Sequence, residues 1–332
     1  TPEEVGMSRP ALEKFVQAMI DLPDEKLADP QIHAVLLARH GKLVLEEYFH
    51  GHSTDRPHDT RSAAKSITSV LAGIAMRKDP SFRPDTPVYK VMNGGQFPEG
   101  LDPQKQQITI ENLLNMSSGL DAIDRLDESR GNEDAVQNQK KDLDWYHVTL
   151  ELPMAYKPGE KAEYASMQAN LVGGAISKQT KTWLPDFLRE NFAKPLGIDR
   201  YYLPMMPTGD AYMGGGVYIL PRDFLKLSQL MLNKGKWNGK EIITEDYVRK
   251  SMEARYTLGT AKYGYLWWMI EYPFQGRKVK AYFAGGNGGQ ISMFIPELDI
   301  AFVAFGGNYA SSATFKMQQE FFPNYVLPAV AN

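Results

Sequence analysis

The sequence predicts an α/β (α+β) fold in which an antiparallel sheet is assembled from both chain ends and a helical domain is inserted between them. Strand patterns occur near residues 32–49 and return at 278–305, and a mostly helical stretch separates them. Turns rich in proline, glycine and aspartate mark the two crossings. We therefore assign residues 1–78 and 207–332 to the sheet domain and 79–206 to the helical domain, with the active site expected at their junction.

Composition limits the classes of protein to which the chain can belong. Its 332 residues suggest two domains at about 150 residues each. The net charge of −3 predicts neither a nucleic-acid partner nor a polybasic membrane patch. The absence of cysteine excludes disulfides, thiolate metal sites and cysteine nucleophiles. No run of 18 apolar residues occurs, so stable insertion into a membrane is not expected.

The individual elements follow from hydrophobic spacing and turn signals. Ser8 before Arg9-Pro10 predicts the start of a helix. The short turn at residues 40–42 joins two strands, which predicts antiparallel pairing. The predicted strands are 34–38, 43–45, 278–283, 290–295 and 300–305, and the later helices are 62–77, 110–116, 167–178, 184–192, 222–233 and 312–322.

The helix that begins at residue 62 carries the first candidate for chemistry. Ser62 and Lys65 are three residues apart, so their hydroxyl and ammonium groups share one face of the helix. A serine on the first helical turn also lies beside unpaired backbone N–H groups. Nucleophilic serine chemistry needs this arrangement and a proton acceptor, a role that lysine can take where burial lowers its pKa. Considered alone, the pair also fits a capping serine and a surface lysine.

Two further motifs follow in the chain. Tyr164 comes after a Pro-Gly turn and before the helix at residue 167, where its phenol can act as a proton carrier or simply pack. The glycine-rich segment 284–290 lies between two predicted strands, where glycines usually mark close backbone approach. A nucleotide-binding loop would lead into a helix, so the strand after this segment argues against one.

In their order and spacing, these motifs resemble those of the serine β-lactamase and penicillin-binding superfamily, in particular its class C-like branch. That branch includes family VIII carboxylesterases, 6-aminohexanoate-dimer hydrolases and D-aminopeptidases. The resemblance covers nearly the whole chain and includes the segments Ser117-Ser118-Gly119-Leu120, Pro221-Arg222-Asp223 and Tyr263-Gly264-Tyr265. It implies a β-lactamase-like fold, with an antiparallel sheet flanked by helices and an inserted all-helical domain.

The resemblance also implies a role for each motif. Ser62 attacks the substrate carbonyl and forms an acyl-enzyme, while Lys65 and Tyr164 share the proton transfers, and which of the two is the base stays open. The backbone N–H groups of Ser62 and Asn287 form the oxyanion hole, with Gly286 replacing Asn287 if the register slips by one residue. Such a donor typically contributes about 3–4 kcal/mol to the transition state.

Substrate-binding residues are expected from the same motifs and from the inserted domain. The candidates are Ser166, Ala284, Gly285, Gly286 and Trp145. Two positions depart from the class C pattern. Ser166 stands where these enzymes have asparagine, and Ala284, or Phe283 in the slipped register, stands where they have lysine.

These departures favour a cofactor-free serine hydrolase that acts on small uncharged esters, which is a carboxylesterase. The alternative is an amidase or peptidase on short linear amides, of the 6-aminohexanoate-dimer or D-aminopeptidase type, followed by a β-lactamase. A penicillin-binding or sensing module with slow turnover is the alternative from a different class. We expect a small ester or amide as the partner and a monomer or homodimer. The resemblance implies a periplasmic or secreted location, and the composition also fits the cytosol.

Other polar clusters are interpreted as structural. His50, His52 and His58 are close in the chain, but their spacing does not match a metallo-hydrolase motif, so we expect surface-loop histidines and no metal. The acidic residues within 121–128 lack the spacing of an EF-hand and predict a solvated loop. Of Trp267 and Trp268, we expect one to be buried and one to lie at a cleft edge.

Overall fold

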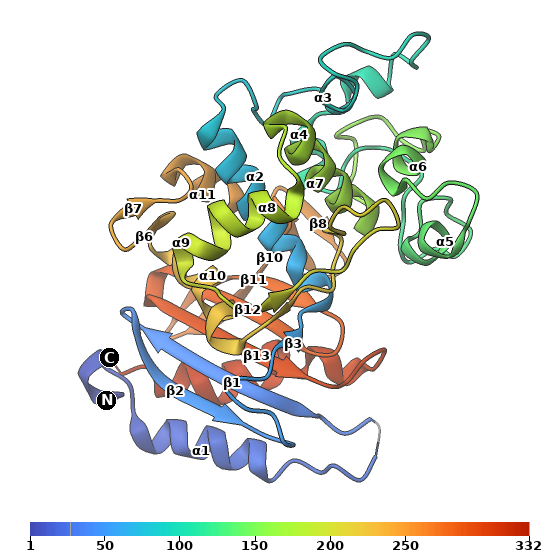
Figure 1. Cartoon of the computed structure of the whole chain (residues 1–332). Coiled ribbons are helices and arrows are strands. Elements are labelled where there is room, and N and C mark those ends of the chain that lie inside the picture. Colours follow the sequence, from blue (N-terminus) through green and yellow to red (C-terminus); the bar gives the residue numbers. More distant parts are fainter. Residues whose placement is uncertain (27, 332) are drawn as a thin grey trace. The chain divides into compact units, whose positions relative to one another are not determined.

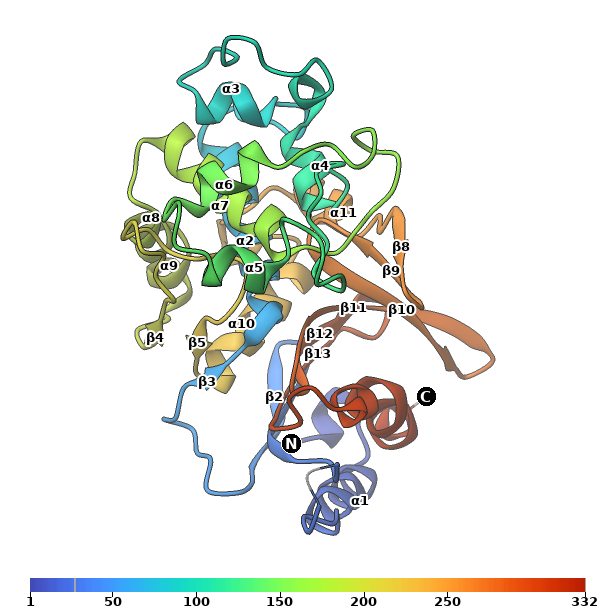
Figure 2. The same cartoon turned by 90° about the vertical axis from the view of Figure 1, so that its right-hand side faces the viewer.

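The computed structural model describes residues 1–26 and 28–331, which pack into two compact units (Figures 1 and 2). The first unit consists of Thr1–Ala63, Tyr218–Asn233 and Met269–Asn332, and the second of Ala64–Val217 and Lys234–Trp268. The domain boundaries expected from the sequence, at residues 78 and 206, stay a prediction.

The antiparallel sheet has eight strands in the order β2-β1-β13-β12-β11-β10-β9-β8. Their bounds are β1 Ile32–Arg39, β2 Lys42–Tyr48, β8 Tyr256–Leu258, β9 Ala261–Gly264, β10 Trp267–Phe274, β11 Arg277–Gly286, β12 Gln290–Ile295 and β13 Ile300–Gly306. Strands β1 and β13 come from opposite ends of the chain and pair side by side, with Leu36 opposite Val303. The predicted sheet, built from both chain ends, is confirmed.

Alternating side chains of β13 form the core of the first unit on both faces of the sheet. Successive residues of a strand point to opposite faces, so Phe302 and Phe305 face different ways. Phe305 stacks on Phe224 of α10 (Pro221–Leu232), with ring centroids 5.4 Å apart. Phe302 packs against Phe15 of α1 (Arg9–Ile20) and Phe322 of the C-terminal helix η7 (Met317–Val326), at 6.5 and 5.0 Å. Figure 1 shows α1 running along the sheet.

A short strand leads the chain from the sheet to the predicted nucleophile. Strand β3 (His58–Asp59) pairs with β5 (Tyr218–Ile219), and the 3₁₀ turn η2 (Arg61–Ala63) follows two residues later. The turn continues directly into α2 (Ala64–Lys78). Ser62 therefore lies where the chain passes from the first unit into the second.

Two buried helices form the centre of the second unit, α2 and α7 (Ser166–Thr180). Residues 64–75 of α2 and 166–176 of α7 are all buried, which explains why their sequences are apolar around most of the helix. A Cβ on Gly174 would lie 2.9 Å from the ring of Tyr146, so glycine allows this close approach.

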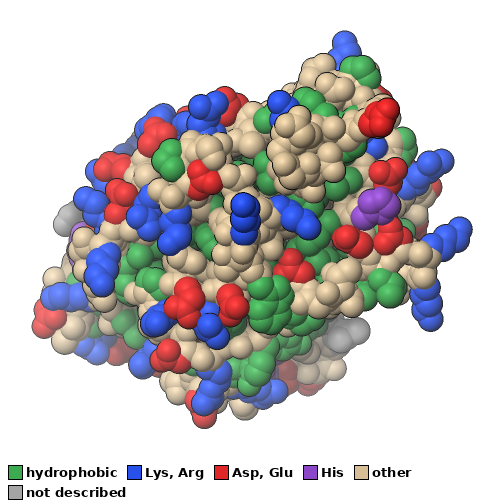
Figure 3. Space-filling model, turned by 45° about the horizontal axis from the view of Figure 1, so that its top comes forward, with side chains coloured by type: hydrophobic (Ala, Val, Ile, Leu, Met, Phe, Trp, Pro, Cys, Tyr) green, Lys and Arg blue, Asp and Glu red, His purple; other side chains and the backbone are tan. Residues whose placement is uncertain are grey.

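The remaining elements of the second unit surround these helices or lie in its loops. They are α3 Val88–Met92, α4 Ile110–Leu114, α5 Glu133–Asn138, α6 Trp145–Glu151, α8 Leu184–Leu188, α9 Lys194–Leu196, α11 Glu245–Ser251, β4 Tyr201–Tyr202, β6 Lys236–Trp237 and β7 Lys240–Glu241. None of the helices in the described part of the chain is long and apolar enough to cross a membrane. On the face shown in Figure 3, basic and acidic side chains are interspersed rather than gathered into patches of one sign.

The structure differs from the sequence-based prediction in strands β8 to β10 and in the last helix. Strands β8, β9 and β10 were not expected, because Glu271 and Pro273 interrupt the alternation of the last of them. The expected helix at 312–322 is a short 3₁₀ turn, Ser312–Phe315, followed by the π-helix η7, which contains Pro323. A proline inside a helix removes a backbone donor and disturbs regular α-helical bonding.

Candidate active site

The backbone before Ser62 is strained. Ser62 is partly exposed in the middle of η2, and the preceding Arg61 has φ +48°, a left-handed conformation that non-glycine residues rarely adopt. The Arg61 N–H donates to Asp59 Oδ1 at 2.8 Å, which helps to hold this conformation. A strained backbone persists only where the surrounding structure holds it in place. Such residues cluster at functional sites.

The end of β11 approaches the backbone that carries Ser62, within the first unit. A Cβ on Gly286 would overlap the carbonyl oxygen of Thr60 and would lie 3.1 Å from the Ala63 nitrogen, so only glycine fits here. Ala284 shares the face of Gly286, because it is two residues away in the strand, and Phe283 points to the opposite face.

The residue after β11 is also fixed in place. Asn287 Oδ1 accepts from the backbone N–H of Ala310 at 2.9 Å, and the Asn287 carbonyl accepts from Gln290 Nε2 at 3.2 Å. Gln290 in turn accepts from the Gly306 N–H and donates to its carbonyl. The turn between β11 and β12 is therefore tied to the end of β13.

In the second unit, Lys65 is fully buried and has defined partners. Its exposed fraction is 1%, and its ammonium donates to Ser166 Oγ at 2.9 Å and to the carbonyl of Gly214. The ammonium also lies 5.0 Å from the ring centroid of Tyr164. The structure thus brings together Lys65, Tyr164 and Ser166, three of the residues singled out from the sequence.

Beneath these residues lie two carboxylates that the sequence analysis did not select. The Ser166 hydroxyl lies 2.7 Å from Asp124 Oδ2 and 3.1 Å from Glu133 Oε2, and the Ser166 N–H donates to Asp124 Oδ2 at 2.8 Å. The Tyr212 hydroxyl donates to Glu133 Oε1. Ser166 therefore links the ammonium of Lys65 to both carboxylates.

The electrostatics of this cluster keep Lys65 charged. Burial alone lowers the pKa of Lys65, but Tyr164, Glu133 and Asp124 together outweigh burial and hold the pKa above its ordinary value. Burial raises the pKa of the Asp124 carboxyl, and the Lys65 charge opposes this rise only in part. The cluster is therefore a buried ammonium balanced by two partly exposed carboxylates.

Aromatic rings surround Tyr164. Trp268 stacks on its ring at 5.7 Å, and Tyr263 meets it edge-on at 6.1 Å. As expected, Trp267 is buried, with 1% exposed, and Trp268 is partly exposed. Trp145 packs edge-on against Tyr212 at 5.5 Å, and its indole N–H has no hydrogen-bond partner among the described residues.

The solvated-loop interpretation of residues 121–128 is wrong for Asp124. The loop folds back so that Asp124 accepts backbone N–H donors from Glu133 at 3.2 Å and from Ser166. Neither local spacing nor periodicity signals this, because the partners are 9 and 42 residues away. A weak signal for Glu133 exists, since an acidic residue at the start of a helix is common, but it does not indicate a buried role.

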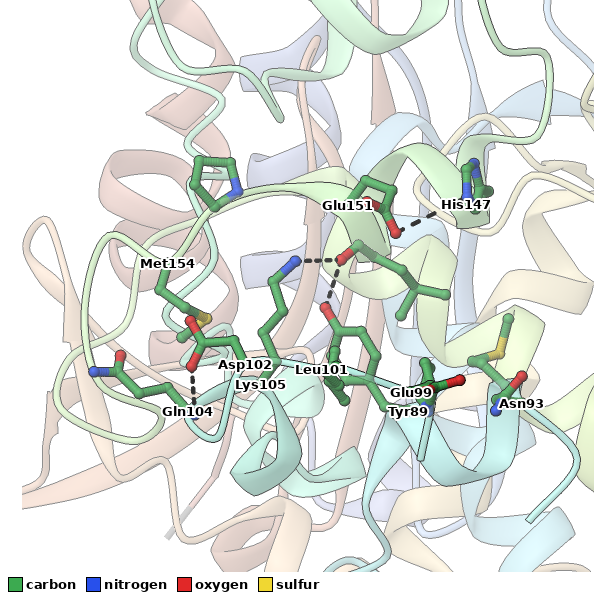
Figure 4. A pocket seen from close by; sticks show the side chains of 15 residues that line it. Tyr89, Asn93, Glu99, Leu101, Asp102, Gln104, Lys105, His147, Glu151 and Met154 are labelled. Atoms are coloured by element: carbon green, nitrogen blue, oxygen red, sulfur yellow. Dashed lines mark hydrogen bonds and ion pairs between the residues drawn. The ribbon is translucent and has the colours of Figure 1, made fainter. Parts of the chain in front are cut away.

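The second unit also contains a pocket of about 930 Å³ between α3 and α6, which none of the predicted site residues lines (Figure 4). Its polar centre is the carbonyl of Leu150, which accepts from Lys105 Nζ at 2.7 Å and from the Tyr89 hydroxyl at 2.6 Å. Burial lowers the pKa of Lys105. Lys105 and Tyr89 therefore both point to one backbone carbonyl, which ties α3 and the η3 turn (Lys105–Gln107) to α6.

The family model described as Beta-lactamase matches residues 26–306. The chain belongs to the beta-lactamase family. As a serine hydrolase of this family, it shares the order of motifs in which Ser62, Lys65 and Tyr164 were recognised. The family resemblance drawn from the sequence is therefore confirmed.

Individual relatives are distant. A 177-residue stretch is 25% identical to Protein flp of Staphylococcus aureus (strain MW2), covering 49% of this chain and 33% of that protein, so the chain matches only a third of the curated relative's length. A Bacteroides dorei structure provisionally described as a beta-lactamase has TM-score 0.74 at 16% identity, covering 96% of this chain and 99% of the other. A Bacillus anthracis structure provisionally described as a 6-aminohexanoate-dimer hydrolase has TM-score 0.72 at 19% identity, covering 89% and 78%. At these identities the structural similarity establishes the fold alone.

Proposed function

We propose that this serine hydrolase acts on small uncharged esters through an acyl-serine intermediate on Ser62. The observation that carries the proposal is the buried Lys65 ammonium, three residues after Ser62, whose charge is already matched by Asp124 and Glu133. An ester needs no positive charge from the site for binding. In addition, an alkoxide leaves more readily than an amine, which requires protonation.

In the proposed reaction, Ser62 Oγ bonds to the ester carbonyl carbon and its proton passes to the pair formed by Tyr164 and Lys65. A lysine that remains an ammonium cannot accept this proton, so the acceptor in this proposal is the Tyr164 oxygen in its phenolate form, whose negative charge the Lys65 ammonium stabilises. The proton then goes to the departing alkoxide when the carbon–oxygen bond of the ester breaks. Water hydrolyses the acyl-enzyme by the same route in reverse.

The proposed oxyanion hole consists of the backbone N–H groups of Ser62 and Asn287. The close approach of Gly286 to Thr60 and Ala63, which flank η2 and close it, supports this register, because Asn287 is the next residue after β11. A preorganised donor of this kind is worth about 3 kcal/mol in the transition state. In the same register, Ala284 occupies the position of the class C lysine.

Ester substrates are expected to be preferred over β-lactams. A β-lactam carries a carboxylate, and a charge-assisted contact to it is worth about 1.5–3 kcal/mol. Ala284 cannot make this contact, and the Ser166 hydroxyl, which is engaged with Lys65 and Asp124, offers no amide N–H₂ to an acylamino side chain. We expect kcat/KM for p-nitrophenyl butyrate to exceed that for nitrocefin by about 10- to 10³-fold.

The test is a panel of p-nitrophenyl esters, a D-alanyl amide, a linear aminohexanoate dimer and nitrocefin, each measured with the wild type and with Ser62→Ala as the background control. Equal or faster turnover of nitrocefin would overturn the ester proposal. Preferred cleavage of the dimer would favour the amidase alternative, which the provisional description of the Bacillus anthracis neighbour supports. A penicillin adduct that persists for hours, with no turnover of the panel, would favour the slow-turnover module.

The carboxylates of Asp124 and Glu133 are expected to act on catalysis through Lys65, as positioning residues. Glu133→Gln keeps the shape of the side chain but removes one of the charges that raise the pKa of Lys65. We expect kcat to fall roughly ten-fold, since a hydrogen bond with a charged group is worth about 1.5 kcal/mol or more. The high-pH limb of the kcat profile should move to lower pH, because the ammonium of Lys65 then loses its proton more easily.

Asp134→Asn is the matched control, because Asp134 is the next residue on α5 and is exposed. Its activity and pH profile should match those of the wild type. A Glu133→Gln variant that loses activity without any change in the position of the high-pH limb would show that Glu133 acts only on stability.

A further inference from the structure

Five of the six histidines of the chain lie within residues 33–58, and three of them converge in the first unit. His33 lies on β1, His52 in the loop after β2, and His58 on β3. Each has one ring nitrogen that could bind a metal ion, and these three nitrogens lie within 4.8 Å of one another. The surface-loop interpretation is wrong for His58, which is 6% exposed, and His33 and His52 are only partly exposed.

The hydrogen bonds of the cluster direct the lone pair of His58 toward His33. His58 Nδ1 donates to the backbone carbonyl of Asp59 at 3.0 Å, so a neutral His58 carries its lone pair on Nε2. That Nε2 faces His33 Nδ1 at 2.8 Å. A metal-binding histidine commonly has its second ring nitrogen bonded to a carbonyl in this way, which fixes the tautomer and the ring orientation.

The backbone is arranged to bring the three rings together. The register of β1 against β13 shifts at His33, and a bulge of this kind re-aims a side chain. The Phe49 N–H donates to the His33 carbonyl and the His52 N–H to the Phe49 carbonyl, each at 3.0 Å, which ties the loop to β1. Gly307, the residue after β13, allows the chain to pass close to the ring of His33, since a Cβ there would lie 2.8 Å from His33 Nε2.

The rings themselves are packed rather than dispersed in solvent. His33 stacks on His52 with centroids 4.0 Å apart, and His58 stacks on Phe305 at 4.5 Å. The ring planes of the cluster are therefore held by packing contacts.

We propose that His33, His52 and His58 form a binding site for a divalent transition-metal ion, with Zn²⁺ as the occupant and water in the open position. Imidazole nitrogens suit Zn²⁺, which they bind at about 2.0–2.1 Å, so tetrahedral ligand atoms lie about 3.4 Å apart. The present nitrogens lie within 4.8 Å of one another, and the His33 and His52 rings must rotate out of their stacked arrangement for both to point at one ion. The proton on His33 Nδ1 then resides on Nε2, so the ligand atoms are Nδ1 of His33, Nε2 of His58 and a ring nitrogen of His52.

The ion would join β1, the loop after β2, and β3. It would thereby fix residues 49–58, and His58 lies four residues before Ser62. His50, which is exposed with its ring 6.3 Å from that of His33, can supply a fourth ligand if the loop closes. The guanidinium of Arg56, by contrast, places a positive charge near all three rings and opposes a cation. The proposal stands independently of the proposed esterase activity.

The test is titration of the chelator-treated full chain with ZnCl₂ by calorimetry. We expect one Zn²⁺ per chain, affinity at least about ten-fold weaker in His52→Gln and His58→Gln, and unchanged affinity in His40→Gln. His40 is the matched control, because it is an exposed histidine of the same unit that pairs with Asp299. Arg56→Gln should bind Zn²⁺ more tightly, which tests the location without removing a ligand.

Two further measurements keep the test decisive if a histidine variant folds poorly. Co²⁺ added to the wild type should give the visible absorption bands of a four-coordinate site, and Zn²⁺ should slow amide hydrogen exchange in residues 49–58. Absence of binding to the wild type at micromolar Zn²⁺ would overturn the proposal. So would stoichiometric binding that survives in His52→Gln and that Arg56→Gln does not alter.

Discussion

Ser62→Ala is expected to lower kcat for esters by about 10⁵- to 10⁶-fold, the loss typical of removing the nucleophile of a serine hydrolase. Without the hydroxyl, no acyl-enzyme forms, and only binding and the oxyanion hole remain to assist attack by water. The variant should remain folded, because the side chain is small and partly exposed on η2. Thermal unfolding of both proteins checks this point.

Peptide mapping after treatment with a fluorophosphonate should find the label on Ser62. Ser66, Ser117 and Ser118 are the relevant competitors in sequence, and the structure predicts that they do not react. Each is at most 1% exposed, and the Ser66 hydroxyl donates to the Leu266 carbonyl at 2.6 Å. Label on any of these three serines, or Ser62→Ala activity within ten-fold of the wild type, would contradict the assignment.

The parts of the fold that the sequence predicts depend on neighbours in the chain. The helix α1 could be predicted because Ser8 accepts from the Ala11 N–H and the apolar residues of the helix recur at its period. The β1–β2 hairpin follows from a tight turn between two apolar runs. The prediction that Ser62 and Lys65 share one helical face rests on the same kind of local spacing.

The parts that the sequence does not predict depend on contacts between distant residues. Asp124 and Glu133 come together only because both contact Ser166, and a loop rich in acids has the same composition whether it is solvated or packed. His33 and His58 are 25 residues apart and meet because β3 follows a loop that returns to β1. Both clusters are polar groups gathered by tertiary structure, where sequence periodicity carries no information.

Lys65 and Tyr164 are expected to act as one proton-transfer unit. Tyr164→Phe keeps the ring between Trp268 and Tyr263 and removes only the hydroxyl, so it should lower kcat by about 10²- to 10⁴-fold with little loss of stability. Lys65→Met should lower kcat at least as much. It should also destabilise the fold by about 3 kcal/mol, because Asp124 and Glu133 lose their buried counter-charge.

The decisive measurement is the double variant, Lys65→Met with Tyr164→Phe. If the two residues form a unit, its kcat should be little below that of the worse single variant, because the second change removes a step that the first has already disabled. Adding Glu133→Gln to Lys65→Met should restore part of the thermal stability without restoring activity, since it removes a carboxylate that has lost its counter-charge but supplies no proton carrier. If the losses of kcat multiply in the double variant, Lys65 and Tyr164 work independently. If Lys65→Met with Glu133→Gln recovers activity, the Lys65→Met variant had lost activity only because it failed to fold.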